Sequence, residues 1–231
     1  MSVNFTVGIY KYTTIPNTFT AKIGNAITKY TSNSGILEIN YAHPVEIPSY
    51  VYYNDTKYEI VEIGLAAFRF CRYIPKMIIP PTIITINTWG LDWLISCTEI
   101  VFLPGSKLTT IATEAICRCY SLKILALPSS LRTINYHSFA YMKTLQSLYI
   151  CGNTSIEADI FEYKANVTDE EAPENLTIFV PFEFNGTIGN RSFTKSYFNQ
   201  ICEFTIKCNS CKYSPLNFRF SYLFTIVFIS L

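Results

Sequence analysis

The chain has 231 residues, which is enough to bury a sizeable hydrophobic core. Apolar residues make up 49% of it and charged residues only 15%, a composition that excludes a disordered polyelectrolyte. The formal net charge of +1 gives no field that would attract phosphates, so we expect no nucleic-acid partner.

Residues 1–62 are expected to form an N-terminal extension and a capping β-hairpin coil. Met1 to Thr6 lack a basic segment followed by an apolar run, so the sequence shows no secretory signal peptide. Val45-x-Ile47-Pro48 matches a motif that recurs further along the chain, and the tyrosine-rich stretch 52–58 that follows predicts a hairpin. Capping coils are irregular because their outer face meets water.

Residues 63–150 contain four regular repeats of 23–25 residues. Each carries an LxxLxL motif whose alternation predicts one short strand per coil. Three further columns of apolar residues keep the same register. A coil cannot cover these columns by itself, so successive coils are expected to stack as a β-rich solenoid with a parallel strand ladder. The motifs begin at Ile74, Cys97, Leu122 and Leu145, and the columns are Ile63, Ile86, Ile111 and Ile134; Phe68, Leu91, Ile116 and Phe139; and Cys71, Leu94, Cys119 and Met142.

Two departures from the regular spacing are expected to lie in loops. The second repeat step is two residues longer than the others, and the extra length falls at Pro104-Gly105-Ser106, where turn-forming residues should leave the columns undisturbed. Ile178-x-Val180-Pro181 repeats the strand pattern after a step of 30 residues, within an irregular C-terminal coil and cap over 151–207. The array should therefore contain about six strands.

Residues 208–231 form a cysteine-containing linker followed by an apolar tail. Phe220 to Leu231 carry no charge, but twelve helical residues span only about 18 Å of a hydrocarbon core of about 30 Å. A glycolipid-anchor signal and a truncated transmembrane segment both fit this pattern, and so does an ordered strand or a frame-shifted end. Membrane association through Phe220 to Leu231 is thus one of several interpretations of the apolar tail.

The repeat unit LxxLxLPxxLxxIxxxAFxxC resembles that of the BspA-like leucine-rich-repeat family, the surface antigen type. The resemblance rests on Ile63-Gly64 with Ala67-Phe68 and Cys71, on Leu127-Pro128 with Leu131 and Ile134, and on 105–111 as a longer variant. It covers roughly residues 45–181. The second repeat departs from the pattern, with Gly90-Leu91 in place of Ala-Phe and Leu94 in place of Cys.

This resemblance implies an α/β-type repeat solenoid, either a leucine-rich-repeat horseshoe or a right-handed coil. It also implies a non-catalytic protein, displayed on a cell surface or secreted, that binds a host or extracellular-matrix protein in adhesion. The absent signal peptide and the unpaired cysteines favour the alternative, an intracellular, cytoplasmic scaffold for protein–protein interaction.

The candidate binding residues are the outward positions of the four predicted strands, which alternate with the buried ones. They combine charged and apolar side chains in a strip of the kind that protein partners use. The alternative is an ordinary solvated solenoid face. The residues are Lys76, Ile78, Glu99, Val101, Ile124, Ala126, Ser147 and Tyr149.

The sequence contains no recognisable enzymatic or cofactor motif. It has two histidines, His43 and His137, and lacks nucleophile, zinc-protease and phosphate-loop patterns, so we expect no catalytic residue and no cofactor. Of the eight cysteines, Cys71 and Cys119 fall on a buried column and Cys97 on an LxxLxL position, as in core packing. Cys208-x-x-Cys211 with Cys202 nearby lacks the second ligand pair of a zinc site, and no metal is expected.

Seven Asn-x-Ser/Thr sequons favour an exported, glycosylated protein, although asparagine and threonine are also common in loops and caps. Between Asn54 and Asn153, where the regular coils pack, the sequence has none. The sequons begin at Asn4, Asn54, Asn153, Asn166, Asn175, Asn185 and Asn190.

Overall fold

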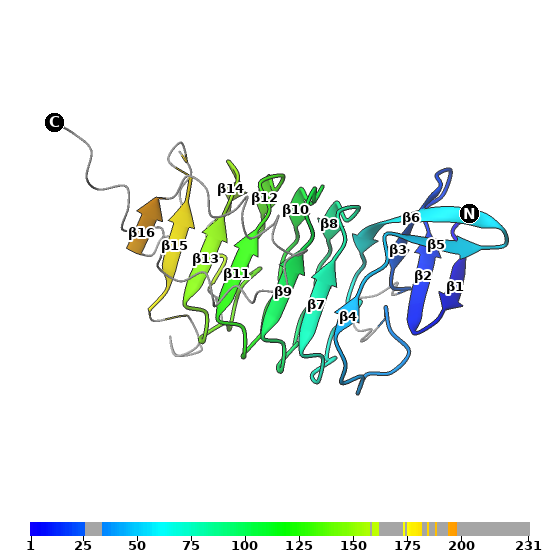
Figure 1. Cartoon of the computed structure of the whole chain (residues 1–231), viewed down its shortest axis with the longest axis horizontal. Helices are drawn as coiled ribbons and strands as arrows, with labels where there is room; N and C mark the ends of the chain where they lie inside the picture. The colour runs from blue at the N-terminus through cyan, green and yellow to red at the C-terminus, as the bar shows by residue number, and fades with distance from the viewer. Residues whose placement is uncertain are drawn as a thin grey trace.

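The structure is a computed structural model that describes residues 1–25, 34–157, 159–161, 173, 175–181, 184, 188 and 194–197. Its coils stack side by side along the long axis of the molecule, from the N-terminal strands to β15 and β16 (Figure 1). Within the described residues, the secondary structure consists of strands and turns without a helix. The repeat solenoid and its parallel strand ladder, predicted from the sequence, are confirmed.

The LxxLxL motifs form the first ladder, whose strands pair parallel and in register within β4-β7-β9 and within β11-β13-β15. Six of its strands match the expected number, and a seventh, β16, pairs with β15. The strands are β4 (Val45–Glu46), β7 (Lys76–Ile79), β9 (Glu99–Phe102), β11 (Ile124–Leu127), β13 (Ser147–Ile150), β15 (Thr177–Val180) and β16 (Thr194–Tyr197).

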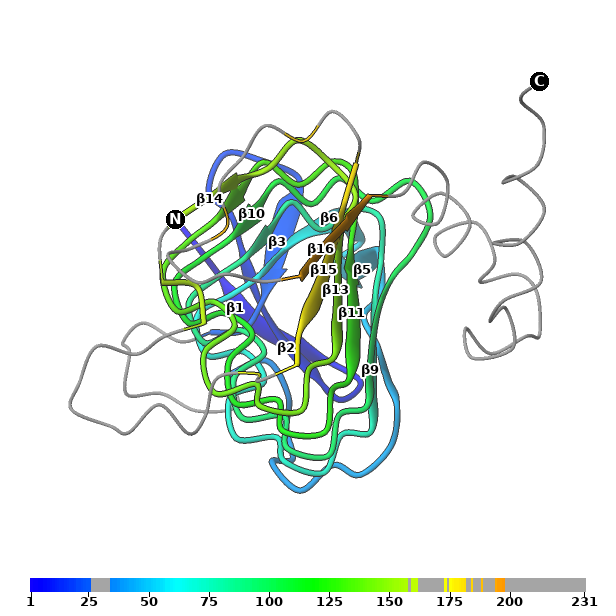
Figure 2. The same cartoon turned by 90° about the vertical axis from the view of Figure 1, so that its left-hand side faces the viewer.

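A second ladder shows that the prediction of one strand per coil was wrong. A Thr-Ile or Ser-Ile pair at the isoleucine column forms a two-residue strand in each coil. Two residues are too short for an alternation pattern to reveal. Figure 2 shows the two ladders on different sides of the stack. The strands of the second ladder are β8 (Thr85–Ile86), β10 (Thr110–Ile111), β12 (Thr133–Ile134) and β14 (Ser155–Ile156).

The N-terminal strands extend this second ladder. β1, β2 and β3 pair antiparallel in sequence, and β3 then pairs parallel with β6, which in turn pairs with β8. β5 and β6 form a hairpin whose central residues, Asn54 and Asp55, both have positive φ (47° and 59°), as a type I′ turn requires. The strands are β1 (Asn4–Val7), β2 (Tyr10–Thr14), β3 (Thr20–Ile23), β5 (Tyr50–Tyr53) and β6 (Thr56–Ile63).

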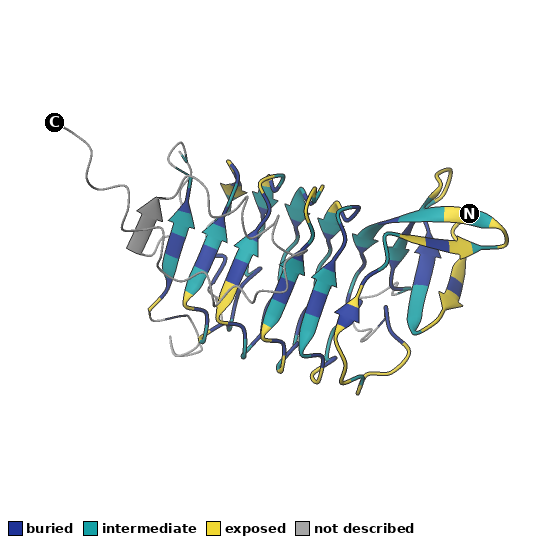
Figure 3. Ribbon diagram, in the orientation of Figure 1, coloured by how far each residue is buried: buried dark blue, intermediate teal, exposed yellow. Residues whose placement is uncertain are grey.

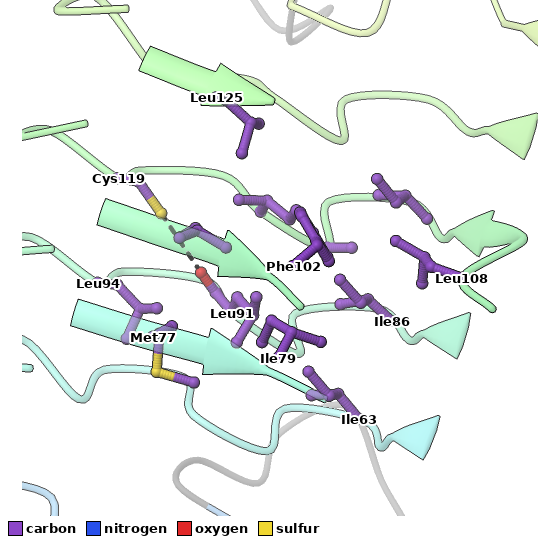
Figure 4. Close-up of a cluster of buried hydrophobic side chains, with 14 of the residues drawn as sticks. Ile63, Met77, Ile79, Ile86, Leu91, Leu94, Phe102, Leu108, Cys119 and Leu125 are labelled. Carbon is purple, nitrogen blue, oxygen red and sulfur yellow. Dashed lines mark hydrogen bonds between the residues drawn. The ribbon is translucent and has the colours of Figure 1, made fainter. Parts of the chain in front are cut away.

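The core lies between the two ladders and consists of the predicted columns. All twelve column residues have an exposed fraction of 0%. Figure 4 shows how members from successive coils, such as Ile63 and Ile86, stack above one another. Cys119 lies in the same core, where its thiol donates a hydrogen bond to the carbonyl of Leu91 (3.5 Å). The buried columns therefore join neighbouring coils into one continuous core.

Each regular coil connects its two ladders through a turn with two left-handed residues four positions apart. Such residues cost about 1–2 kcal/mol each when they are not glycine, and here they are alanine, aromatic or charged. The strain is offset because the amides of these turns donate to carbonyls of the next coil, as Phe70 does to Asp92 (3.1 Å). The positions are Ala66, Trp89, Glu114, His137 and Asp159, with Phe70, Trp93, Arg118 and Tyr141.

The two-residue insertion interrupts the first ladder. Within the described residues, β9 and β11 are neighbours without paired registers, whereas β8, β10 and β12 pair continuously. The extra residues form an exposed turn in which Gly105 has a φ of +77°. The buried columns stay in place across the insertion, as expected, while the first ladder divides into β4-β7-β9 and β11-β13-β15-β16.

Candidate protein-binding face

The predicted outward residues form two rows along the first ladder. Lys76 pairs with Glu99 and Ile78 with Val101 on β7 and β9, while Ile124 pairs with Ser147 and Ala126 with Tyr149 on β11 and β13. Seven of the eight residues are half-buried, and Ile124 is exposed (Figure 3). The structure thus brings the candidates onto one face, in two groups separated at the β9–β11 interruption.

The first row begins with an ion pair. Lys76 Nζ lies 2.8 Å from Glu99 Oε2, and both side chains are about one-third exposed. A pair this accessible to water contributes less than about 1 kcal/mol to stability. The pair therefore provides two opposite charges at the surface and contributes little to the stability of the fold.

The second row is apolar and ends in a stacked aromatic pair. Ile78, Val101, Ala126 and Tyr149 lie on successive strands of the ladder. The ring of Tyr149 stacks on that of Phe179 with centroids 4.3 Å apart and planes inclined by 7°. Stacked, partly exposed aromatics of this kind are frequent anchors in protein interfaces.

Phe179 and Thr177 belong to this face although the sequence analysis did not include them. They occupy the outward positions of β15, and Thr177 pairs with Ser147. The signal was present, because Ile178-x-Val180 had been matched to the strand motif and the same alternation points Phe179 outward. β15 follows β13 after a step of 30 residues, which sets it apart from the four regular repeats.

A row of buried side chains supports the face from the core side of the strands. Met77, Ile100, Leu125, Leu148 and Ile178 occupy the inward positions of the same strands and are at most 6% exposed. Close packing restricts the backbone to one arrangement, so the outward side chains are presented at fixed spacing. A preorganised surface loses little entropy when it binds a partner.

A buried ionic network lies at the turn edge of the coils, away from the strand face. Asp92 has an exposed fraction of 0%. Its carboxylate accepts hydrogen bonds from Arg69 Nε (3.2 Å), Arg118 Nη1 (3.0 Å) and Cys117 Sγ (3.0 Å). Burial raises the pKa of the Asp92 carboxyl, whereas Arg118, Cys117 and Arg69 act in the opposite direction. The network joins three successive coils.

Aromatic rings cover this network. The guanidinium of Arg69 lies 4.1 Å from the ring centre of Trp89, and that of Arg118 lies 5.6 Å from Trp93 and 4.9 Å from Tyr141. The indole N–H of Trp89 donates to Glu114 Oε2 (3.0 Å). These contacts are cation–π and hydrogen-bonding interactions between coils. Local sequence patterns do not reveal these contacts, because the partners are 20 to 25 residues apart.

Four cysteines are free thiols in the core: Cys71, Cys97, Cys117 and Cys119. Burial raises the pKa of Cys71 and of Cys97 to about 12 and that of Cys117 and Cys119 well above the ordinary value. Cys151, by contrast, is disulfide-bonded. Cys202, Cys208 and Cys211 lie outside the described residues.

The four free thiols are expected to resist alkylation in the folded protein. At a pKa of about 12, the thiolate fraction at neutral pH is about a thousandfold below that of an exposed thiol. Peptide mass spectrometry after brief iodoacetamide treatment should find these sites unmodified until denaturant is added. A Lys123→Cys variant supplies an exposed position as the reactive control. Rapid labelling of Cys71 or Cys97 in the folded state would contradict the packing.

Neither histidine lies in a cluster suited to catalysis. The imidazole of His43 packs edge-on against Tyr41 at 5.4 Å, and His137 occupies a left-handed turn position. Among the described residues, no group of three or more His, Cys, Asp or Glu side chains could hold a metal ion. The same part of the chain contains no helix long and apolar enough to cross a membrane. The apolar tail Phe220 to Leu231 lies outside it.

Two strand ladders enclosing repeated apolar columns define a leucine-rich-repeat protein. The model of the BspA type leucine rich repeat region matches six copies over residues 45–168, which is more than half of the chain. The chain therefore belongs to the BspA-type leucine-rich-repeat family, as the sequence resemblance indicated. Repeats of this family are generally non-catalytic, and leucine-rich-repeat proteins generally bind other proteins. Among curated proteins, none matches the chain.

Solved structures share the fold at low sequence identity. The pneumococcal vaccine antigen PcpA matches with a TM-score of 0.56 and 17% identity over 84% of this chain and 48% of its own. A leucine rich cell surface protein from Faecalibacterium prausnitzii matches with a TM-score of 0.57 and 18% identity, over 87% and 52%. A leucine-rich repeat protein from Bacteroides capillosus has a TM-score of 0.50 and 19% identity, over 67% and 99%. The chain thus spans about half the length of the first two.

Proposed function

We propose that this protein is a non-catalytic adhesion module, displayed on a cell surface or secreted, that binds a protein partner through the outward face of its first ladder. The observation that carries the proposal is the apolar row that ends in the Tyr149–Phe179 stack. An apolar strip beside a row that contains the Lys76–Glu99 ion pair and Ser147 has the composition of a protein interface with a core and a rim. The partner class is a host or extracellular-matrix protein.

Two further observations support export. Cys151 is disulfide-bonded, and disulfides persist mainly in oxidising compartments. PcpA is a vaccine antigen, and the Faecalibacterium neighbour is a cell surface protein. Surface biotinylation of intact cells should label the chain. If labelling occurs only after the cells are lysed, the alternative of an intracellular scaffold is favoured and export is contradicted.

The binding face is tested by truncating its aromatic end. Tyr149→Ala and Phe179→Ala should each weaken binding to immobilised matrix proteins by about tenfold or more, because anchor aromatics contribute roughly 1.4 kcal/mol or above. Surface plasmon resonance with each variant measures the change.

The matched control is Tyr52→Ala, since Tyr52 is 65% exposed on the β5–β6 hairpin, outside the face. This control should bind as the unaltered chain does, and all variants should keep their melting temperature within a few degrees. Equal binding by the Tyr149 and Phe179 variants, with folding intact, would exclude the face as the contact surface.

A further inference from the structure

The asparagine side chains that begin sequons differ in position from the other asparagines of the coils. The four that lie among the described residues are all exposed: Asn4, Asn54, Asn153 and Asn175. The coil asparagines Asn87 and Asn135 are half-buried and begin no sequon. Asn87 is engaged in packing, because its amide donates to Glu62 Oε1 (3.0 Å).

Three of the exposed sequon asparagines lie outside the strands, in the connections between them. Asn54 occupies the tip of the β5–β6 hairpin, Asn153 lies between β13 and β14, and Asn175 lies two residues before the start of β15. Asn4 differs, since it lies in β1 and its Oδ1 accepts a hydrogen bond from Thr13 Oγ1 (2.7 Å). These three side chains are exposed and lie outside the paired strands, so a substituent on them would leave the hydrogen bonds of both ladders intact.

From this arrangement we infer that Asn54, Asn153 and Asn175 are N-glycosylation sites, an inference that rests on the proposed export of the chain. The donor is a lipid-diphosphate-linked oligosaccharide. The amide nitrogen of asparagine attacks the anomeric carbon of the first sugar, so that an N–C bond forms while the bond from that carbon to the diphosphate oxygen breaks. The nitrogen loses one proton to a base of the transferase, and the lipid diphosphate leaves.

The strands that carry the proposed binding face lie in a part of the sequence without sequons. Residues 55–152, which contain β7, β9, β11 and β13, carry no sequon. Glycans at Asn54, Asn153 and Asn175 would all be attached outside this stretch, so β7, β9, β11 and β13 would carry none themselves. Glycans are bulky and soluble, so they would keep this partly apolar surface from associating with itself.

The test is peptide mapping of the protein purified from its own cells, before and after treatment with peptide N-glycosidase, which converts a glycosylated asparagine to aspartate. We expect conversion at Asn54, Asn153 and Asn175. In cells expressing variants, Asn54→Gln, Asn153→Gln and Asn175→Gln should each remove one glycan from the intact mass. The exposed non-sequon residue Asn40 provides the matched control, and Asn40→Gln should leave the mass of the glycans unchanged.

A second set of variants separates glycan loss from misfolding. Thr56→Ala should abolish the glycan at Asn54 and Thr56→Ser should retain it, since the serine keeps the hydroxyl that a sequon requires. Unmodified asparagine at all three sites, in protein that surface biotinylation labels on intact cells, overturns the glycosylation and leaves export standing. Unmodified sites in protein that only lysis makes accessible overturn both proposals.

Discussion

Phe139→Ala is expected to lower the free energy of unfolding by about 3–5 kcal/mol, because it empties a position in a closed apolar column. Phe139 is fully buried, and its ring lies 6.1 Å from that of Phe161 in the following coil. Its amide also donates to the carbonyl of Ile160 (2.9 Å), so the surrounding backbone is tied and cannot collapse into the cavity. Equilibrium unfolding in urea, followed by circular dichroism, measures the loss.

Two variants provide the comparison. Phe139→Leu keeps most of the volume and should cost less than about 1.5 kcal/mol. Tyr136→Ala, three residues away and 47% exposed, should change stability by about 0.5 kcal/mol or less. Similar losses for Phe139→Ala and Tyr136→Ala would show that the column is not packed as described. Because neighbouring coils stabilise one another in a solenoid, the whole array should lose stability together with this coil.

Asp92→Ala is expected to destabilise the protein by about 3 kcal/mol, near the lower end of what the loss of one partner from a buried ion pair costs. Without the carboxylate, the guanidinium groups of Arg69 and Arg118 would lose the hydrogen-bond acceptor that they share. The loss of stability is not larger because the side chains of Arg69 and Arg118 are 19% and 15% exposed and can form hydrogen bonds with water. Thermal and urea unfolding of the variant measure it.

Asp92→Asn distinguishes charge from shape in this network. The amide oxygen can still accept from Arg118, so this variant should be less destabilised than Asp92→Ala. The exposed pair Lys76–Glu99 serves as the control, and Glu99→Gln should cost less than about 1 kcal/mol. If Asp92→Ala proves as stable as Glu99→Gln, the network does not hold the coils together.

The repetition of the sequence was enough to predict the solenoid. A column such as Ile63, Ile86 and Ile111 is apolar in every unit, and only the next coil can cover it. The alternation within LxxLxL likewise predicts which side chains face outward, and it places Lys76 and Tyr149 on one face. That a protein binds this face stays a prediction, because the repeat pattern reflects packing and carries no information about a ligand.

The tertiary structure decided what depends on contacts between coils. The Thr-Ile pairs become strands because each finds an identical pair one coil away, and a two-residue stretch alone has no detectable period. Asp92 is charged yet fully buried, which only its partners in the adjacent coils, Arg69 and Arg118, make tolerable. The ladder also breaks after β9, since backbone pairing depends on the exact path of the coil that carries the insertion. Apolar periodicity is a property of each unit and can be read along the chain, whereas hydrogen bonds and ion pairs between units depend on the stacking itself.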